Sequence, residues 1–319
     1  MHSDIESLIK LPLSSSVPNL ENTNYTDGLV SAIIPSYNME DFVLEAIASA
    51  LSQTYPHVEV IVVDDGSVDR TADRVAKLSS DSRLKYFYQE NQGLPAARNA
   101  AIEHSNGEFI ALLDADDLWL PDKISLQVEY LRSSGVGLAC ALVQRIDEFG
   151  KHLPNIDLPL STGKVGGKLL FDNFITCPTA IFRRTCLEAT GLFDENLTTG
   201  EDYDLWLRIS SKYQVGSIAQ RLAKYRVRKG QMSSNQTKMI SNAIRIMRRF
   251  EESETEAYTE SEQKLAWAKT YVTWSNFERA SFNSSFLSLR LYLKALSFKF
   301  TYMPAWKGLI KWLIRYPGG

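Results

Sequence analysis

Three carboxylates follow a short apolar run about a third of the way along the 319-residue sequence. Asp114, Asp116 and Asp117 come directly after residues 109–113, which are all apolar. Such a run predicts a strand covered on both faces of a sheet. Ionised carboxylates are costly to bury, so three of them at the end of a buried strand need a counter-charge. A divalent cation held by oxygen ligands and by a phosphate-bearing substrate would supply it.

A helix cap is the structural alternative for this cluster. Asp116 or Asp117 would then cap a helix that opens at Pro121. Capping accounts for one aspartate but not for three, so the pattern favours a metal site.

The elements around the cluster alternate between strand and helix. The first strand is expected to end at Pro35, because proline cannot donate to a strand ladder. The alternation predicts an α/β fold with a doubly wound, mostly parallel sheet and right-handed crossovers. Ligands of such sheets bind at the carboxyl ends of the strands, so Asp65, Arg98 and Asp116 should meet in one crevice. The predicted strands are 29–34, 58–63, 84–88 and 109–113, and the predicted helices between them are 39–53, one after residue 67, and 95–104.

Two common nucleotide-binding patterns are missing from the sequence. No GxGxxG follows the first strand, and no GxxxxGK[ST] occurs anywhere. The dinucleotide-binding and P-loop classes are therefore excluded.

The sequence after the cluster continues the alternation and then becomes helical. A helix is expected at 121–133, strands near 137–143 and at 179–183, and a loop at 151–167. A further helix should begin at Glu201 and Asp202. From residue 236 onward the apolar spacing is helical throughout.

Composition restricts the class of protein. Apolar residues make up 44%, charged residues 23%, and the net charge is −3, as in ordinary globular proteins. No basic excess and no nucleic-acid-binding motif is present, so no nucleic-acid partner is expected. The cysteines are odd in number and lack metal-ligand spacing, which predicts reduced thiols and a cytoplasmic location.

Residues 1–27 are polar and aperiodic, which predicts a mobile leader.

Charge is distributed unevenly along the chain. From Arg279 to the C-terminus there are seven basic residues and no acidic one. Basic residues beside aromatic-rich apolar faces are typical of helices that lie on an anionic membrane surface. A solvated basic face, with its apolar stripe in the core, explains the pattern equally well.

Five segments together resemble glycosyltransferase family 2. They are PSYN at 35–38, VDDGS at 63–67, NQG at 91–93 with ARN at 97–99, LDADD at 113–117, and GED at 200–202 followed by Trp206 and Arg208. The resemblance covers about residues 29–234. It implies the GT-A fold, inversion at the anomeric carbon, a nucleotide-diphospho-sugar donor and a Mn²⁺ or Mg²⁺ cofactor. The expected domains are 28–235 for catalysis and 236–319 for a helical region.

The resemblance also implies roles for individual residues. Pro35, Tyr37, Asp65 and Arg98 match positions that hold the nucleoside, and Asp114 would face the ribose. Asp116 matches the cation ligand. Asp202 matches the general base, which would deprotonate the acceptor hydroxyl as it attacks. Arg98 could instead form a surface ion pair, and Glu201 with Asp202 could instead stabilise a helix N-terminus.

One position departs from the family pattern. Members often carry a histidine that reaches the diphosphate in a YRxHxxxxS-like segment, and Arg228 stands at that place here. Arginine can neutralise phosphate with a permanent charge and two parallel hydrogen bonds. The resemblance thus places Arg228 at the donor diphosphate.

The absence of a QxxRW segment and of a spanning apolar stretch predicts transfer of one sugar per encounter. UDP is the nucleotide expected from the family. The expected acceptor is a glycan or lipid-linked glycan in surface polysaccharide synthesis, with the enzyme peripheral on the inner face of the cytoplasmic membrane.

Two other functions fit parts of the pattern. A sugar-1-phosphate nucleotidyltransferase also uses carboxylates and a metal, but it would need a glycine-rich basic loop after the first strand, where PSYN stands. A non-catalytic sugar-nucleotide-binding protein would be expected to lack the metal or base carboxylate, and Asp116 and Asp202 are both present.

Overall fold

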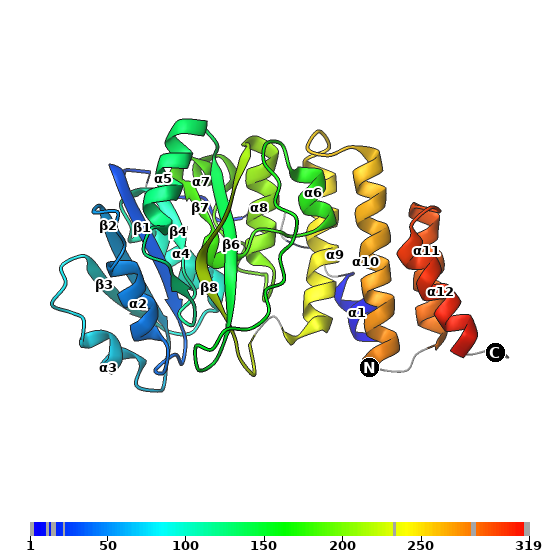
Figure 1. Cartoon of the computed structure of the whole chain (residues 1–319), viewed down its shortest axis with the longest axis horizontal. Helices are drawn as coiled ribbons and strands as arrows, with labels where there is room; N and C mark the ends of the chain where they lie inside the picture. The colour runs from blue at the N-terminus through cyan, green and yellow to red at the C-terminus, as the bar shows by residue number, and fades with distance from the viewer. Residues whose placement is uncertain are drawn as a thin grey trace. The chain divides into compact units, whose positions relative to one another are not determined.

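The computed structural model describes residues 3–10, 13, 17–21, 23–231, 234–281 and 285–315 (Figure 1). The chain divides into two compact units. The sheet unit comprises Ser14–Lys164 and Phe174–Gln231, and the helical unit comprises Met1–Leu13, Val165–Asn173 and Met232–Gly319. The division expected at residues 27/28 and 235/236 stays a prediction, and part of the expected leader lies outside the described residues.

Eight strands form one mixed sheet in the sheet unit, in the order β3-β2-β1-β4-β7-β6-β8-β5 (Figure 1). The first four are parallel to one another, as are β6 and β8, whereas β7 and β5 pair antiparallel with their neighbours. The predicted α/β fold with a mostly parallel sheet is therefore confirmed. The strands are β1 (Thr26–Ser36), β2 (Val58–Asp65), β3 (Leu84–Gln89), β4 (Gly107–Leu112), β5 (Leu118–Trp119), β6 (Leu138–Asp147), β7 (Ile181–Arg183) and β8 (Val215–Val227).

Helices cover both faces of this sheet. On one face, Val30, Ala32 and Ile34 of β1 share a buried cluster with residues of α2 and α5. α4 packs against β1 and β2 through its own buried alanines and Ile102. The helices of the unit are α2 (Val43–Leu51), α3 (Thr71–Ala76), α4 (Leu94–Glu103), α5 (Lys123–Ser134), α7 (Arg184–Thr190) and α8 (Glu201–Lys212), with a 3₁₀ turn at Cys177–Thr179.

The expectation that the first strand ends at Pro35 is wrong. β1 continues through Pro35 to Ser36. The Val30 N–H bonds toward β2, so the even-numbered amides of β1 face β2 and the odd-numbered ones face β4. Pairing with β4 ends at Ile33 and Leu112, whereas pairing with β2 continues to Ser36 and Asp64. The missing N–H of Pro35 therefore falls on the side where the ladder has already ended.

The longest strand, β8, has no counterpart among the predicted elements. Its sequence has polar residues scattered through it, and only some of its positions are buried. It pairs with β6 through two register shifts between Ala141 and Val143. Since these shifts break the alternation of buried residues, period-2 patterning could not reveal the strand. β8 carries residues 225–227 to the neighbourhood of the aspartate cluster.

The helical unit contains α1 (Ser3–Leu8), α6 (Gly166–Phe171), α9 (Gln236–Ser253), α10 (Glu260–Ser281), α11 (Ser285–Phe298) and α12 (Met303–Arg315). Small residues allow close packing here: a Cβ on Gly308 would lie 2.2 Å from the Tyr292 ring. Ala268, Tyr292, Leu309 and Trp312 belong to one buried cluster of α10, α11 and α12. Among the described helices, none has the length and apolar character needed to cross a bilayer.

Candidate active site

The loops after β1 and β2 are bonded to each other. The Asn38 N–H donates to the Ser67 hydroxyl at 2.8 Å, and the Val68 N–H donates to the Asn38 side chain at 2.9 Å. Asn38 has a φ of 52° in the left-handed region, which asparagine tolerates better than most residues. These bonds fix the backbone beside Pro35 and Tyr37. The Tyr37 side chain is 47% exposed and is free to lie against a ligand.

Asp65, at the end of β2, holds the loop that leads into α4. One of its oxygens accepts from the Gln89 side chain at 2.7 Å and from the Gln92 N–H at 2.9 Å. The other accepts from the Gly93 N–H at 2.8 Å. Gly93 has a φ of 96°, a conformation that glycine adopts without strain. Asp65 thereby sets the start of the helix that carries Arg98.

Arg98 is buried and connects two carboxylates. Its side chain is 2% exposed, and its guanidinium lies 2.6 Å from Asp114 and 2.5 Å from Glu201. It also donates to the Cys177 sulfur at 3.2 Å. The alternative of a surface ion pair is wrong, since the pair is inside the protein. Arg98 joins α4 to the first turn of α8 and to the segment that follows β4.

Asp202 follows Glu201 in the first turn of α8. Burial, together with the neighbouring Glu201 carboxylate, raises the pKa of Asp202 to about 7. α8 begins after Gly200, whose φ of 77° again suits glycine. A carboxyl group whose pKa is near neutrality can accept a proton and release it under ordinary conditions, as a general base must.

Asp116 and Asp117 are held by the end of β8. The Arg226 N–H donates to Asp117 at 2.7 Å, and the Arg226 side chain donates to the Asp116 carbonyl at 2.7 Å. Arg228 forms an ion pair with the Asp116 carboxylate at 2.6 Å. The capping alternative is wrong, because β5 separates these residues from α5 and Asp122 occupies the N-cap position.

The charges of the cluster fit a divalent cation. Burial and the charge of Asp114 raise the pKa of Asp116, and burial with the charge of Asp116 raises the pKa of Asp117 well above its usual range. Within the described residues, the second oxygen of Asp117 has no hydrogen-bond partner. Carboxylate oxygens are the ligands that Mn²⁺ and Mg²⁺ prefer. Among the same residues, no three His, Cys, Asp or Glu side chains lie together as a complete ligand set, so a cation here would need further oxygen ligands from outside the protein.

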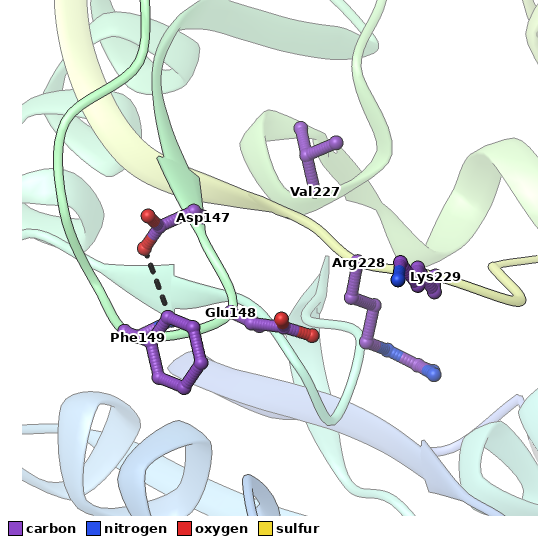
Figure 2. Close-up of a pocket in the computed structure, with 6 residues that line it drawn as sticks. All are labelled: Asp147, Glu148, Phe149, Val227, Arg228 and Lys229. Atoms are coloured by element: carbon purple, nitrogen blue, oxygen red, sulfur yellow. Dashed lines mark hydrogen bonds between the residues drawn. The ribbon is translucent and has the colours of Figure 1, made fainter.

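A pocket borders this cluster (Figure 2). Its volume is about 300 Å³, and it lies between the turn after β6 and the end of β8. It is lined by Asp147, Glu148, Phe149, Val227, Arg228 and Lys229. Through the Arg228–Asp116 pair, the pocket is connected to the aspartate cluster.

Some of the predicted site residues are in direct contact in the structure, and others are not. Arg98 and Asp114 are in direct contact, as are Asp116 and Arg228. Asp202 lies near enough to Arg98 and Asp114 for their charges to affect its pKa. Asp65 reaches Arg98 only through the start of α4, and no recorded hydrogen bond of a described residue joins it to the aspartates. The roles assigned to these residues stay predictions.

Three contact residues were not recognised from the sequence. Glu201 is the partner of Arg98, Cys177 contacts both Arg98 and Asp114, and Arg226 holds the loop at 116–117. The sequence contained a signal for two of them: Glu201 stands beside Asp202, and Arg226 belongs to the Tyr225-Arg226 segment. Cys177 had no sequence signal, since its contacts depend on the fold.

Comparison with known proteins agrees with this architecture. The family model "Glycosyl transferase family 2" matches residues 31–190, and the chain belongs to that family. A protein of Escherichia coli, "UDP-Glc:alpha-D-GlcNAc-diphosphoundecaprenol beta-1,3-glucosyltransferase WfgD", is 33% identical over 71% of this chain and 88% of its own length. An uncharacterized glycosyltransferase of Rickettsia bellii is 37% identical over 66% of this chain. This chain spans about a third of the length of the Rickettsia relatives it matches first, 30% to 34%.

Solved structures show the same fold at low sequence identity. TarS 1-349 of Staphylococcus aureus in complex with UDP has a TM-score of 0.63 and 16% identity, with 91% of each chain covered. The mannosyltransferase PcManGT of Pyrobaculum calidifontis, in complex with GDP-Man and Mn²⁺, has a TM-score of 0.57 and 20% identity over 97% of this chain and 90% of that one. The chain therefore has the GT-A fold of glycosyltransferases.

Replacing Arg98 with leucine should destabilise the sheet unit strongly. Glu201 would be left buried without its counter-charge, which typically costs about 3–5 kcal/mol. The measurement is the free energy of unfolding in urea, followed by tryptophan fluorescence. The double variant Arg98→Leu/Glu201→Gln should recover part of the loss, since the uncompensated charge is gone. Arg70→Ala, which removes an exposed ion pair with Glu40, serves as the control and should change nothing measurable. Equal stability of Arg98→Leu and Arg70→Ala would contradict the buried bridge.

Proposed function

We propose that this protein is an inverting glycosyltransferase that moves a sugar from a UDP-sugar to a hydroxyl group of a lipid-linked glycan acceptor. The observation that carries the proposal is the Arg98 bridge, which connects Asp114 of the aspartate cluster to Glu201 beside Asp202. A donor-binding end of the sheet and a proton acceptor are thus held by one buried group. No observation on the described residues favours nucleotidyl transfer or a binding protein without activity.

The reaction follows from this arrangement. The acceptor hydroxyl attacks the anomeric carbon of the donor sugar, and its proton passes to the Asp202 carboxylate. As the new C–O bond forms, the bond to the diphosphate breaks and its electron pair leaves with UDP. A single displacement of this kind inverts the anomeric carbon and needs only one base. The near-neutral pKa of Asp202 suits that role.

Asp116 is the residue proposed to hold the cation, with Asp114 beside it. Carboxylates of this number supply only part of the coordination shell, and the donor diphosphate would complete it. When bound, the cation stabilises the negative charge that develops on the leaving diphosphate. The Mn²⁺ present with GDP-Man in the archaeal neighbour supports this assignment.

Arg228 is proposed to change partners when the donor binds. In this structure its guanidinium neutralises Asp116 at 2.6 Å. A cation at Asp116 would take over that neutralisation and repel the guanidinium, and the donor phosphates would offer it a new partner. Gly230, with a φ of 77°, follows Arg228 closely and provides a turn at this point.

Support for a lipid-linked acceptor comes from the relatives and from the helical unit. The name of the E. coli relative states an undecaprenyl-diphosphate-linked acceptor. Between residues 285 and 315 there is no acidic residue. Seven large apolar side chains of this segment are exposed: Phe286, Leu293, Phe300, Met303, Ile310, Leu313 and Ile314. Exposed apolar and basic residues together suit the surface of an anionic bilayer, which supports the proposal that the protein is peripheral on the inner face of the cytoplasmic membrane.

Replacing Asp202 with asparagine should lower kcat by about 10²–10⁴-fold, because the attacking hydroxyl loses its proton acceptor. The measurement is release of UDP in the presence of donor and acceptor. Asp73→Asn, at an exposed carboxylate of α3, is the control and should retain full activity. Unchanged turnover in Asp202→Asn would refute the base assignment.

The rate should also depend on pH in a defined direction. A base works only when ionised, and the pKa of Asp202 is about 7. The value of kcat/KM should therefore fall about tenfold per pH unit below that value and be constant above it. A profile that is flat between pH 5.5 and pH 8.5 would show that Asp202 does not accept the proton.

Binding of UDP should raise the melting temperature more with Mn²⁺ than with EDTA, since a ligand of the native state stabilises it more the lower its Kd, and the cation should lower the Kd of UDP. Asp116→Asn should lose the metal-dependent part of the shift. Asp73→Asn should keep it. A shift that is the same with Mn²⁺ and EDTA would contradict the cation site.

Liposomes that contain anionic lipids should carry the protein upward in a flotation gradient, and neutral liposomes should not. Each basic residue near an anionic surface contributes on the order of 1 kcal/mol. The double variant Ile310→Asp/Ile314→Asp should remain at the bottom. Val68→Asp, at an 89% exposed site of the sheet unit, is the matched control. Flotation of the double variant would contradict membrane binding through α12.

A further inference from the structure

One wall of the pocket at the ends of β6 and β8 is a turn held by hydrogen bonds of its own backbone N–H groups. The Asp147 carboxylate accepts from the Phe149 N–H at 3.0 Å and from the Lys151 N–H at 2.9 Å. The Gly150 N–H donates to the Asp147 carbonyl at 3.0 Å, and Gly150 has a φ of 82°. These bonds define a tight turn that does not depend on the side chains of Glu148 and Phe149.

A second contact attaches this turn to the catalytic side of the sheet. Arg226 donates to the Glu148 carbonyl at 3.1 Å, and the same side chain donates to the Asp116 carbonyl. The turn is therefore held at a fixed position relative to the aspartate cluster. A rigid turn of this kind positions its side chains at little entropic cost when a ligand binds.

The turn presents Phe149 to solvent. Its side chain is 87% exposed, although it is among the largest apolar side chains of the protein. Figure 2 shows Phe149 and Glu148 on the turn, with Arg228 and Lys229 on the segment that follows β8. An exposed aromatic ring contributes binding free energy when a ligand covers it.

The groups around the pocket are complementary to a phosphorylated sugar. The Phe149 ring can lie against the apolar C–H face of a pyranose. The Glu148 carboxylate can accept hydrogen bonds from sugar hydroxyls, and the Lys229 ammonium can pair with a phosphate.

We infer that this pocket is the acceptor subsite, and that it binds a sugar joined to a diphosphate. The inference rests on the proposed function. The residues proposed to hold the nucleoside belong to β1, β2 and α4, whereas the pocket lies at the ends of β6 and β8, beyond β4 and β7 in the sheet. Of the pocket residues, Arg228 also reaches Met39 and Phe42, which follow β1. Arg228 lines the pocket and pairs with Asp116, so an acceptor in the pocket would lie beside the donor diphosphate. Phe149 and Lys229 are thereby specificity-determining residues for the acceptor.

The test uses the full chain and a defined probe, α-GlcNAc-diphosphate carrying an undecyl chain. Its binding to the wild type and to Phe149→Ala is measured by isothermal titration calorimetry. Loss of the ring should weaken binding about tenfold. Phe149→Tyr keeps the ring and should bind as the wild type does. Tyr88→Ala, which removes a 63% exposed aromatic residue from β3, is the matched control and should have no effect.

The melting shift produced by UDP and Mn²⁺ is measured on the same variants and should be unchanged in Phe149→Ala. Loss of that shift would place the ring in the donor site and overturn the inference. Equal binding of the probe by the wild type and Phe149→Ala, or no binding by either, would overturn it as well. If probe binding depends on Phe149 but no sugar is transferred from any donor, the subsite stands and the proposed function fails.

Discussion

The rest of the site depends on one buried guanidinium. Arg98 is 2% exposed and has carboxylates on two sides, Asp114 and Glu201. Such a pair contributes little net stability, because removing its charges from water costs about as much as their attraction returns. What it provides is geometry: its two ion pairs hold α4, the first turn of α8 and the segment after β4 against one another. Segments separated by 103 residues of sequence are thereby held at hydrogen-bond distance.

The charge of the site is not balanced by its own arginines. Asp114, Asp116, Asp117, Glu201 and Asp202 face Arg98, Arg226 and Arg228 at the ends of the strands. The excess of carboxylates is one reason why the pKa values of Asp116, Asp117 and Asp202 are raised. A site in this state gains stability from an added cation, and a donor that brings a diphosphate with the cation keeps the total charge moderate. The raised pKa values are therefore what the proposed binding of a cation together with a diphosphate would relieve.

The sequence predicted the half of the fold in which buried strands are apolar throughout. β2 and β4 are recognisable because both faces are covered, and carboxylates stand at the carboxyl end of each, the edge where such sheets usually bind ligands. The predicted end of β1 at Pro35 was wrong. A missing N–H interrupts a strand only if it would face a paired neighbour, and the sequence does not show which neighbour that is. The partner of Arg98 was missed for a similar reason: Glu201 stood next to a residue with a clearer chemical role, and its contact arises only in the folded chain.

β8 shows why the remainder was harder to predict. A strand with a neighbour on each side is normally recognised from its buried apolar side chains. The side chains at the end of β8 instead form contacts within the site. Arg226 holds the aspartate loop and the turn at Glu148, and Arg228, just beyond the strand, neutralises Asp116. Local sequence preference is expected to fail where side chains serve a site rather than a core. The segment that resembles a strand least is therefore the one that connects the aspartate cluster to the pocket, and its polar residues are evidence of that connection.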